Sequence, residues 1–228
     1  MNLLCGSFAV VAALMYNDLT LAFWLIVAGI VFDFFDGFVA RLLHSSSAIG
    51  VQLDSLADVI TSGLAPAAVL WQVCLQTEPC WLPETWKLGY GVFVLAAFSA
   101  LRLAKFNIDE TQTVEFCGLP TPAGSLLCAS LGMLWQQGML ALSSDGVLLI
   151  AVLTSLLLVS PIRMFALKFH GFGWRGNEVR YLFLLASIVL IIILRTYAIP
   201  VIIVLYIVVS AVRWLCMHSG NPDKAPKA

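Results

Sequence analysis

Four aspartates stand close together in a chain that is otherwise strongly apolar. Asp33 and Asp36 occur in one hydrophobic run, and Asp54 and Asp58 occur in the next, so that four of the 13 acidic residues fall within 26 positions. A carboxylate near lipid is costly unless it is paired, hydrated or bound to a metal. The cluster therefore predicts a site for a polyvalent cation.

The spacing of the aspartates predicts how they meet. Asp33 and Asp36 are three residues apart, and Asp54 and Asp58 are four apart; both spacings put side chains on one face of a helix. A turn near residues 45–46 would fold the two helices into an antiparallel hairpin, with position 33 level with 58 and position 36 level with 54. The four carboxylates would then converge about 10–15 Å below the connecting loop.

The residues beside the aspartates suit a phosphate-bearing ligand. Hard divalent cations, Mg²⁺ or Mn²⁺, prefer oxygen ligands and keep coordination positions open for phosphate oxygens. Gly37, Ala40 and Gly50 continue the same helix faces and leave space for a bulky group. Arg41 lies just past this face, where it is placed to grip a phosphate. Carboxylates, a divalent metal, an arginine and open space together describe a site for phosphoryl chemistry.

Two other interpretations of the aspartates remain open at this stage. The acids would form buried salt bridges if they paired with Arg41, Arg102 or Lys105, but one arginine and two more distant cations neutralise four acids poorly. A cation channel or transporter would also place acids in a membrane. It would not explain why they crowd into one hairpin while the later segments carry almost none.

The elements that must position these residues are hydrophobic segments. The chain is 61% hydrophobic and 11% charged, with a mean hydropathy of +0.97, whereas soluble domains carry about 25% charged residues. Several apolar runs reach the roughly 20 residues that cross a bilayer. We therefore expect an all-α, polytopic membrane bundle of about eight transmembrane helices. The expected segments are 2–15, 19–43, 48–76, 86–106, 121–142, 146–169, 179–195 and 198–217.

The distribution of positive charge predicts the orientation of the bundle, because lysine and arginine favour the cytoplasmic side. With the amino terminus inside, ten cations fall on or near that side and only Lys87 and Arg195 fall outside. Both termini and the aspartate hairpin are therefore expected at the cytoplasmic face. The ten cations are Arg41, Arg102, Lys105, Arg163, Lys168, Arg175, Arg180, Arg213, Lys224 and Lys227.

Composition also limits the domains and partners of the chain. We expect a single transmembrane domain over residues 1–217 and a polar cytoplasmic tail over 218–228. The net charge of −1 argues against nucleic acid as a partner, because nucleic-acid binding needs a basic stripe. The six cysteines show no Cys-x-x-Cys pair and no zinc spacing, so we expect most of them to be small buried hydrophobic residues.

The hairpin resembles the signature of the CDP-alcohol phosphotransferases at all eight fixed positions. The signature is D-x-x-D-G-x-x-A-R, eight residues, then G-x-x-x-D-x-x-x-D, and it runs from Asp33 to Asp58. Members of that family are integral membrane enzymes with six core helices. They move a substituted phosphate from a CDP-linked donor to an alcohol and release CMP. The resemblance implies this fold and this activity for the chain.

The resemblance also implies a role for each motif residue. Asp33, Asp36 and Asp54 would hold Mg²⁺ or Mn²⁺, and Asp58 would be the general base and would complete the metal set. Gly37 and Ala40 would make room for the cytidine nucleotide, and Arg41 would lie near the phosphates. The residues expected to bind the CDP-linked donor are Asn2, Asp33, Gly37, Ala40, Arg41 and Gly50.

Four further runs, one of which overlaps the end of the hairpin, look like the phosphatidylserine synthase branch of that family, and the resemblance covers roughly residues 1–165. It implies CDP-diacylglycerol and L-serine as substrates, phosphatidylserine and CMP as products, and a bacterial inner membrane as the location. It also implies membrane lipid and a homodimer as partners. The four runs that carry the resemblance are 2–6, 53–67, 102–107 and 118–124.

A zwitterionic acceptor such as serine needs a cation or a helix N-terminus for its carboxylate. Arg102 and Lys105 lie three residues apart at the expected cytoplasmic end of one segment, and Asn107 follows them. Thr121 and Pro122 read as the cap and first turn of the next segment, where backbone N–H groups favour anions. We expect these five residues to bind serine, although topological anchoring and a plain helix cap explain them equally well.

Other substrates remain open as well. The same chemistry would serve glycerol 3-phosphate or inositol phosphate as acceptor, or an archaeal donor such as CDP-archaeol with serine. An acceptor that carries a phosphate should bring extra basic residues to the site. A divalent-cation transporter is the alternative from a different functional class, and it predicts cation flux without any nucleotide.

Overall fold

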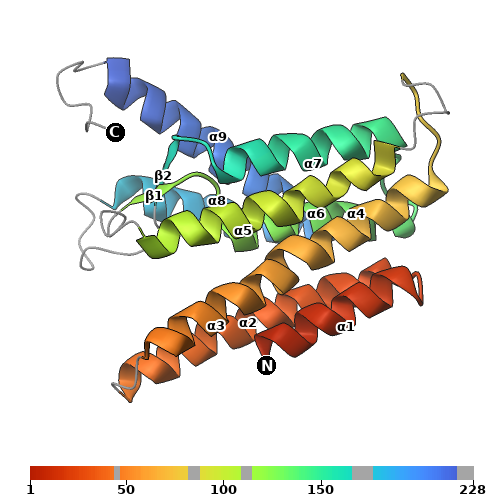
Figure 1. Cartoon of the computed structure of the whole chain (residues 1–228). Coiled ribbons are helices and arrows are strands. Elements are labelled where there is room, and N and C mark those ends of the chain that lie inside the picture. The colour runs from red at the N-terminus through yellow and green to blue at the C-terminus, as the bar shows by residue number, and fades with distance from the viewer. Residues whose placement is uncertain (44–46, 82–87, 109–114, 166–176, 220–228) are drawn as a thin grey trace.

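The computed structural model describes residues 1–43, 47–81, 88–108, 115–165 and 177–219. Within these residues the chain forms nine α-helices that lie roughly side by side (Figure 1). Short 3-10 helices, η2 (Leu88–Phe93) and η3 (Arg195–Tyr197), precede α5 and α9. The α-helices are α1 (Asn2–Leu14), α2 (Leu19–Leu42), α3 (Ala48–Asp58), α4 (Ala65–Gln76), α5 (Val94–Ile108), α6 (Thr121–Gln136), α7 (Ser144–Leu158), α8 (Glu178–Leu194) and α9 (Ala198–Ser219).

The expected apolar segments are all found as helices, but not all of them have the length of a membrane span. In the described part of the chain, four helical stretches are long and apolar enough to cross a membrane by length and composition, and α1 and α7 are shorter apolar helices. The expected count of eight spans stays a prediction. The four stretches are Leu19–Val39, Ile49–Gln76, Gly89–Ile108 and Glu178–Cys216.

The helices run between two ends of the bundle (Figure 1), and the polar residues at these ends differ. The aspartate end, defined by Asp33, Asp36, Asp54 and Asp58, includes the end of α2, the whole of α3 and the end of α5. The opposite end includes the α1–α2 turn, the ends of α4 and α6 and the start of α7. We call it the amide end, and we define it by the four side-chain amides of Asn17, Gln72, Gln76 and Gln136.

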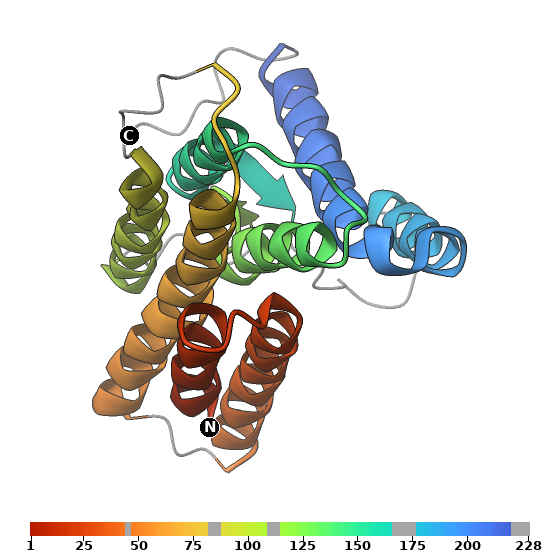
Figure 2. The same ribbon diagram turned by 90° about the vertical axis from the view of Figure 1, so that its right-hand side faces the viewer.

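Helix α1 lies between α2 and the α3–α4 helix (Figure 2), and glycine allows this close approach. A Cβ atom on Gly6 would lie 2.8 Å from the Cα atom of Thr61, and one on Gly29 would lie 2.7 Å from its Cγ2 atom. The Thr61 hydroxyl donates a hydrogen bond of 3.1 Å to the backbone oxygen of Asn2. The contact therefore fixes the first turn of α1 beside the end of α3.

A π-helical turn, η1 (Val59–Leu64), interrupts the helix expected over 48–76. It begins directly after Asp58, and its residues Thr61, Ser62 and Gly63 are buried. The Ser125 hydroxyl of α6 donates a hydrogen bond to the Thr61 carbonyl oxygen at 3.4 Å. Single π-turns widen a helix and occur frequently at functional sites. This one changes the register between the acidic face of α3 and the buried face of α4.

The fold is not purely α-helical, and two predicted segments are too long. The segment expected over 146–169 ends its helix at Leu158, because Pro161 follows closely and cannot continue a helix. Residues Arg163–Phe165 then form strand β2, which pairs antiparallel with β1 (Glu115–Cys117). The segment expected over 121–142 ends at Gln136, where Gly138 adopts the left-handed φ of +69° that terminates helices.

Candidate active site

Asn2 joins two of the aspartates that the sequence predicts to meet. Its side-chain nitrogen donates hydrogen bonds to Asp33 Oδ1 at 3.1 Å and to Asp58 Oδ1 at 2.9 Å. One amide group therefore holds a carboxylate of α2 and a carboxylate of α3 at the same depth, and the prediction that positions 33 and 58 lie level is confirmed. The two helices approach through α1, which packs on both of them, rather than through a simple hairpin contact.

The other two aspartates complete the cluster. The carboxylate of Asp54 lies within hydrogen-bonding distance of that of Asp33. Asp36 is exposed, and its Oδ2 atom lies 3.8 Å from the amino group of Met1. Asn2, Asp33, Asp36 and Asp54 all line one cavity of about 850 Å³, which we call the aspartate cavity. Three of the four carboxylates therefore line one cavity, and Asp58 is joined to them through its hydrogen bond with Asn2.

Salt bridges do not explain the aspartates in the residues that can be described. Among them, the Met1 amino group is the one cation within 4 Å of the four carboxylates. Arg102 interacts with Asp58 electrostatically but forms no ion pair with it. The side chain of Arg41, at the end of α2, lies outside the described residues.

The donor set fits a hard divalent cation by its chemistry. Two carboxylates in direct contact, those of Asp33 and Asp54, repel each other unless a proton or a cation lies between them. Oxygen-only donors of this kind suit Mg²⁺ or Mn²⁺. As the side chains stand, however, no three acidic, histidine or cysteine groups of the described chain are arranged to hold an ion. The metal set Asp33, Asp36, Asp54 and Asp58 therefore stays a prediction.

Small residues leave the cavity open, as the sequence predicts. A Cβ atom added to Gly37 would meet nothing within 4 Å. Gly50 also lines the cavity. It takes part in the cap of α3 as well, because its N–H donates a hydrogen bond of 3.0 Å to the Ser47 hydroxyl. A Cβ atom added to Gly50 would lie 3.1 Å from that hydroxyl oxygen. The side chain of Ala40 lies outside the described residues, so its predicted role stays untested.

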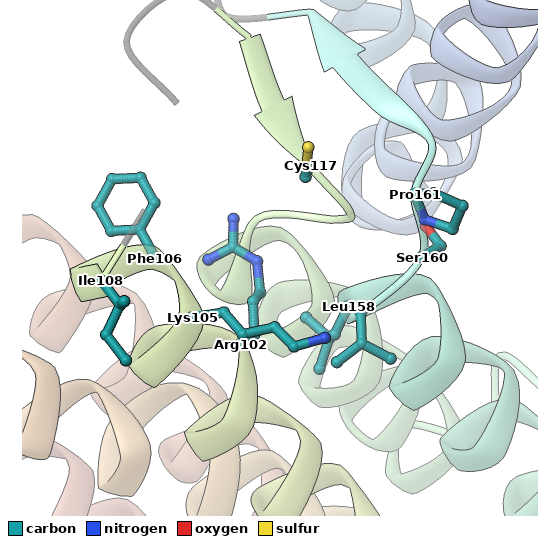
Figure 3. A pocket seen from close by; sticks show the side chains of 9 residues that line it. Arg102, Lys105, Phe106, Ile108, Cys117, Leu158, Ser160 and Pro161 are labelled. Atoms are coloured by element: carbon teal, nitrogen blue, oxygen red, sulfur yellow. The ribbon is translucent and has the colours of Figure 1, made fainter. Parts of the chain in front are cut away.

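A second cavity, of about 420 Å³, lies between the end of α5, the end of α7 and strand β1 (Figure 3). Arg102 and Lys105 line it, and we call it the arginine cavity. Arg102 is only 8% exposed, and its Nε atom has no hydrogen-bond partner among the described residues. Its guanidinium points toward Cys117 on the opposite wall (Figure 3). A buried cation with an unused donor is suited to an anionic ligand.

The structure separates the five residues expected to bind serine. Arg102 and Lys105 line the arginine cavity together. Thr121 is the first residue of α6, and the cap of this helix is Pro120 instead. The Thr121 hydroxyl accepts a long hydrogen bond of 3.5 Å from Arg102 Nη1. Pro122 does not line the cavity. Asn107 also lies outside its lining.

Asn107 instead connects two helices. Its side-chain nitrogen donates a hydrogen bond of 2.9 Å to the Ser55 hydroxyl of α3. Its predicted contact with serine has no support from this position.

Sequence reasoning missed several residues of the site. Cys117 and Ser160 line the arginine cavity, but they come together only because β1 pairs with β2, and short strands between hydrophobic helices leave no periodic pattern. Asn2 was expected at the donor site. Its bridge between Asp33 and Asp58 depends on how α1 packs, which local spacing does not show.

Asp58 lines neither cavity, but it interacts with one lining residue of each. It accepts its hydrogen bond from Asn2, which lines the aspartate cavity, and it interacts electrostatically with Arg102, which lines the arginine cavity. A ligand in one cavity could therefore donate a proton to the Asp58 carboxylate and then attack a second ligand held in the other cavity. The geometry thus supports transfer between two ligands.

Known proteins with similar sequences carry out transfer reactions of this kind, according to their names. A family model described as CDP-alcohol phosphatidyltransferase matches residues 1–162. A CDP-diacylglycerol–serine O-phosphatidyltransferase of Bacillus subtilis is 33% identical over 170 residues, covering 75% of this chain and 88% of that protein. A protein of the same name from Helicobacter pylori is 31% identical over 200 residues (86% and 80%), and one from Mycobacterium tuberculosis is 33% identical over 241 aligned positions (98% and 81%).

Proposed function

The chain belongs to the CDP-alcohol phosphatidyltransferase family, and we propose that it transfers the phosphatidyl group of CDP-diacylglycerol to the hydroxyl of L-serine. The products are phosphatidylserine and CMP. The observation that carries the proposal is that Asp58 accepts a hydrogen bond from Asn2, which lines the acidic cavity, and interacts electrostatically with Arg102, which lines the cationic one. The names of the relatives support serine as the acceptor.

The aspartate cavity is the proposed donor site. It is the larger of the two, at about 850 Å³, and its lining mixes the carboxylates with exposed apolar side chains such as Leu53 and Phe34. The apolar side chains suit the acyl chains of a lipid, which must extend sideways into the bilayer. Gly37 leaves open space beside the carboxylates, and this space suits the cytidine nucleotide. We assign donor binding to Asn2, Asp33, Gly37, Ala40, Arg41 and Gly50.

The arginine cavity is the proposed serine site. The unused Nε donor of Arg102 and the ammonium group of Lys105 suit the serine carboxylate. Among the described residues that line this cavity, Arg102 and Lys105 are the charged ones. Two cations suit the single carboxylate of serine, whereas glycerol 3-phosphate or inositol phosphate would need further cations for its phosphate.

The residues of the chain divide the reaction between them. Asp58 takes the proton from the serine hydroxyl as that oxygen attacks the phosphorus of the phosphatidyl group. The new P–O bond forms while the bond to the CMP phosphate breaks, and CMP leaves with the electron pair. Asn2 keeps Asp58 oriented through its hydrogen bond of 2.9 Å. A divalent cation, when bound by Asp33, Asp36, Asp54 and Asp58, would screen the pyrophosphate and stabilise CMP as the leaving group.

Membrane placement follows from the same proposal. The cations expected inside occur, where described, in the elements of the aspartate end: the ends of α2, α5 and α9, strand β2 and the first turn of α8 (Figure 1). We propose that this end faces the cytoplasm of a bacterial inner membrane, with both termini inside. The homodimer implied by the family resemblance and the single domain over 1–217 stay predictions, and residues 220–228 of the expected tail lie outside the described residues.

One reaction tests the proposal. Purified protein is incubated with CDP-diacylglycerol, Mn²⁺ and labelled serine, and labelled lipid and CMP are measured. Parallel reactions replace serine with glycerol 3-phosphate or inositol phosphate, or the donor with CDP-archaeol. We expect labelled lipid and equimolar CMP with serine. Product with another acceptor and none with serine would overturn the serine assignment, and cation flux without any nucleotide would overturn the enzymatic one.

A further inference from the structure

Helices α8 and α9 lie beyond the residues that match the family model, yet α9 reaches the wall of the arginine cavity. Tyr206 of α9 is 8% exposed, and its hydroxyl donates a hydrogen bond of 3.0 Å to the backbone oxygen of Phe165 in β2. Its ring also packs edge-to-face on the Phe165 ring, with centroids 4.9 Å apart, and lies 5.9 Å from the Phe183 ring of α8. The end of β2 is thus held by both a polar and an aromatic contact.

Strand pairing carries this support to the cavity. Phe165 pairs with Glu115, and at the other end of the same two strands Arg163 pairs with Cys117. Cys117 is the residue of β1 that lines the arginine cavity, opposite Arg102 (Figure 3). The chain continues through Gly118, whose N–H donates to the Ile162 oxygen at 2.9 Å. The pairing of β1 with β2 therefore fixes the cavity wall that faces Arg102.

Tyr206 also lies near the cationic side of the cavity. Its side chain is within electrostatic range of the Arg102 guanidinium, but the described residues show no hydrogen bond between the two. Arg102 has few other restraints: its Nη1 atom makes the long bond of 3.5 Å to Thr121, and its Nε atom has no partner among the described residues. The Tyr206 hydroxyl therefore supports the wall that faces the guanidinium.

We propose that Tyr206 is a positioning residue for the acceptor cavity, through which the C-terminal helices hold the β1–β2 wall opposite Arg102. This inference rests on the proposed serine site. It gives α8 and α9 a part in acceptor binding, although they lie outside the matched family region. Tyr206 touches no reacting atom, so its removal should affect acceptor binding more than the chemical step.

The test is Tyr206→Phe in the full-length enzyme, which keeps the aromatic packing and removes the hydroxyl. We expect the KM for serine to rise about twofold to tenfold, the loss that one neutral hydrogen bond predicts. The kcat and the KM for CDP-diacylglycerol should change less than about twofold. A merely structural contact would instead lower the amount of folded enzyme without this split between the two substrates.

Cys117 provides a second readout that does not depend on turnover. Its half-buried thiol lies on the wall in question, so its rate of labelling by N-ethylmaleimide reports how well the wall is held. We expect faster labelling in Tyr206→Phe, and protection by serine in the parent enzyme. Cys80, which is exposed near the amide end, serves as the internal reference and should label at an unchanged rate.

Tyr197→Phe is the matched control. Its hydroxyl also donates to a backbone oxygen, that of Met139 at 2.7 Å, but far from the arginine cavity. This variant should leave both the serine KM and Cys117 labelling unchanged. If Arg102→Gln raises the serine KM while Tyr206→Phe changes neither readout, the role of Tyr206 is overturned and the serine site stands. If Arg102→Gln leaves the serine KM unchanged, the proposed serine site itself is overturned.

Discussion

The two ends of the bundle treat their polar groups in opposite ways. At the amide end, neutral side chains satisfy one another across three elements. Asn17 Oδ1 accepts hydrogen bonds from Gln76 Nε2 at 2.8 Å and from Gln72 Nε2 at 3.1 Å. Gln136 donates to the Asn17 backbone oxygen, and its own side-chain oxygen accepts from the Thr20 N–H at 2.9 Å. These bonds close the α1–α2 turn against α4 and α6.

At the aspartate end, charged side chains of one sign stand together instead. Asp33 and Asp58 share a single donor, Asn2, and Asp33 also contacts Asp54. Most of the oxygen lone pairs of these carboxylates have no hydrogen-bond donor among the described residues. The negative charges also repel one another, and no positive side chain of the described chain is close enough to neutralise them. The comparison indicates that the amide end stabilises the fold through its internal hydrogen bonds. The carboxylates of the aspartate end instead need ligands to satisfy their charges and lone pairs.

Removal of divalent cations should give the largest difference between the two ends. A chelator is expected to abolish serine-dependent CMP release, and Mg²⁺ or Mn²⁺ should restore it. Added metal should also raise the thermal unfolding midpoint of the parent protein but not of Asp33→Asn/Asp54→Asn, because those carboxylates are its expected ligands. Full activity in the chelator, or an equal thermal shift in the double variant, would contradict the predicted metal set.

Asp58→Asn should give the next largest effect. Loss of a general base lowers turnover by about 10²–10⁴-fold, and we expect CMP release to fall by that factor. The matched control is Asp145→Asn at the amide end, which should retain kcat within about twofold. Near-normal turnover of Asp58→Asn, in protein that remains folded and inserted in the membrane, would remove the general-base assignment.

A change at the amide end should alter stability and spare activity. Asn17→Ala removes the side-chain bonds to Gln72 and Gln76, and we expect the free energy of unfolding to fall by about 1 kcal/mol because those bonds are exposed. Asn17 also has a positive φ of 51°, so Asn17→Gly, which relieves that backbone cost, should be less destabilising. A loss of kcat without a loss of stability would contradict the division between the two ends.

The smallest predicted effect is a pH dependence at the amide end. Hydrogen bonds from the side chain of Ser143 and from the N–H groups of Cys80, Trp81 and Gly146 lower the pKa of Asp145 to about 2. The unfolded value is about 3.9, so this carboxylate stabilises the fold fully above about pH 4 and loses that effect as the pH falls toward 2. Thermal unfolding should show the gap between the parent protein and Asp145→Asn narrowing below pH 4. A constant gap would contradict the assignment.

The amino-acid sequence by itself determined the features that depend on near neighbours. The spacing of Asp33, Asp36, Asp54 and Asp58 set which carboxylates share a helix face, and the apolar runs set where helices form. Both follow from the helix period and from hydropathy, which a short stretch of chain contains in full. The match of the hairpin to a family signature is local information of the same kind.

Only the tertiary structure decided the contacts between segments far apart in the sequence. Asn2 bridges Asp33 and Asp58 because Gly6 and Gly29 let α1 approach Thr61 of η1. Such contacts depend on which helices pack together and on small shifts of register, and no local pattern specifies either.

The arginine cavity depends on the same kind of long-range packing. Its wall exists because β1 pairs with β2, and Tyr206 holds that pair from a helix near the end of the chain. The acidic half of the site and the two cations Arg102 and Lys105 could therefore be predicted from the sequence. The wall opposite those cations could not, because it depends on contacts between segments that are far apart in the chain.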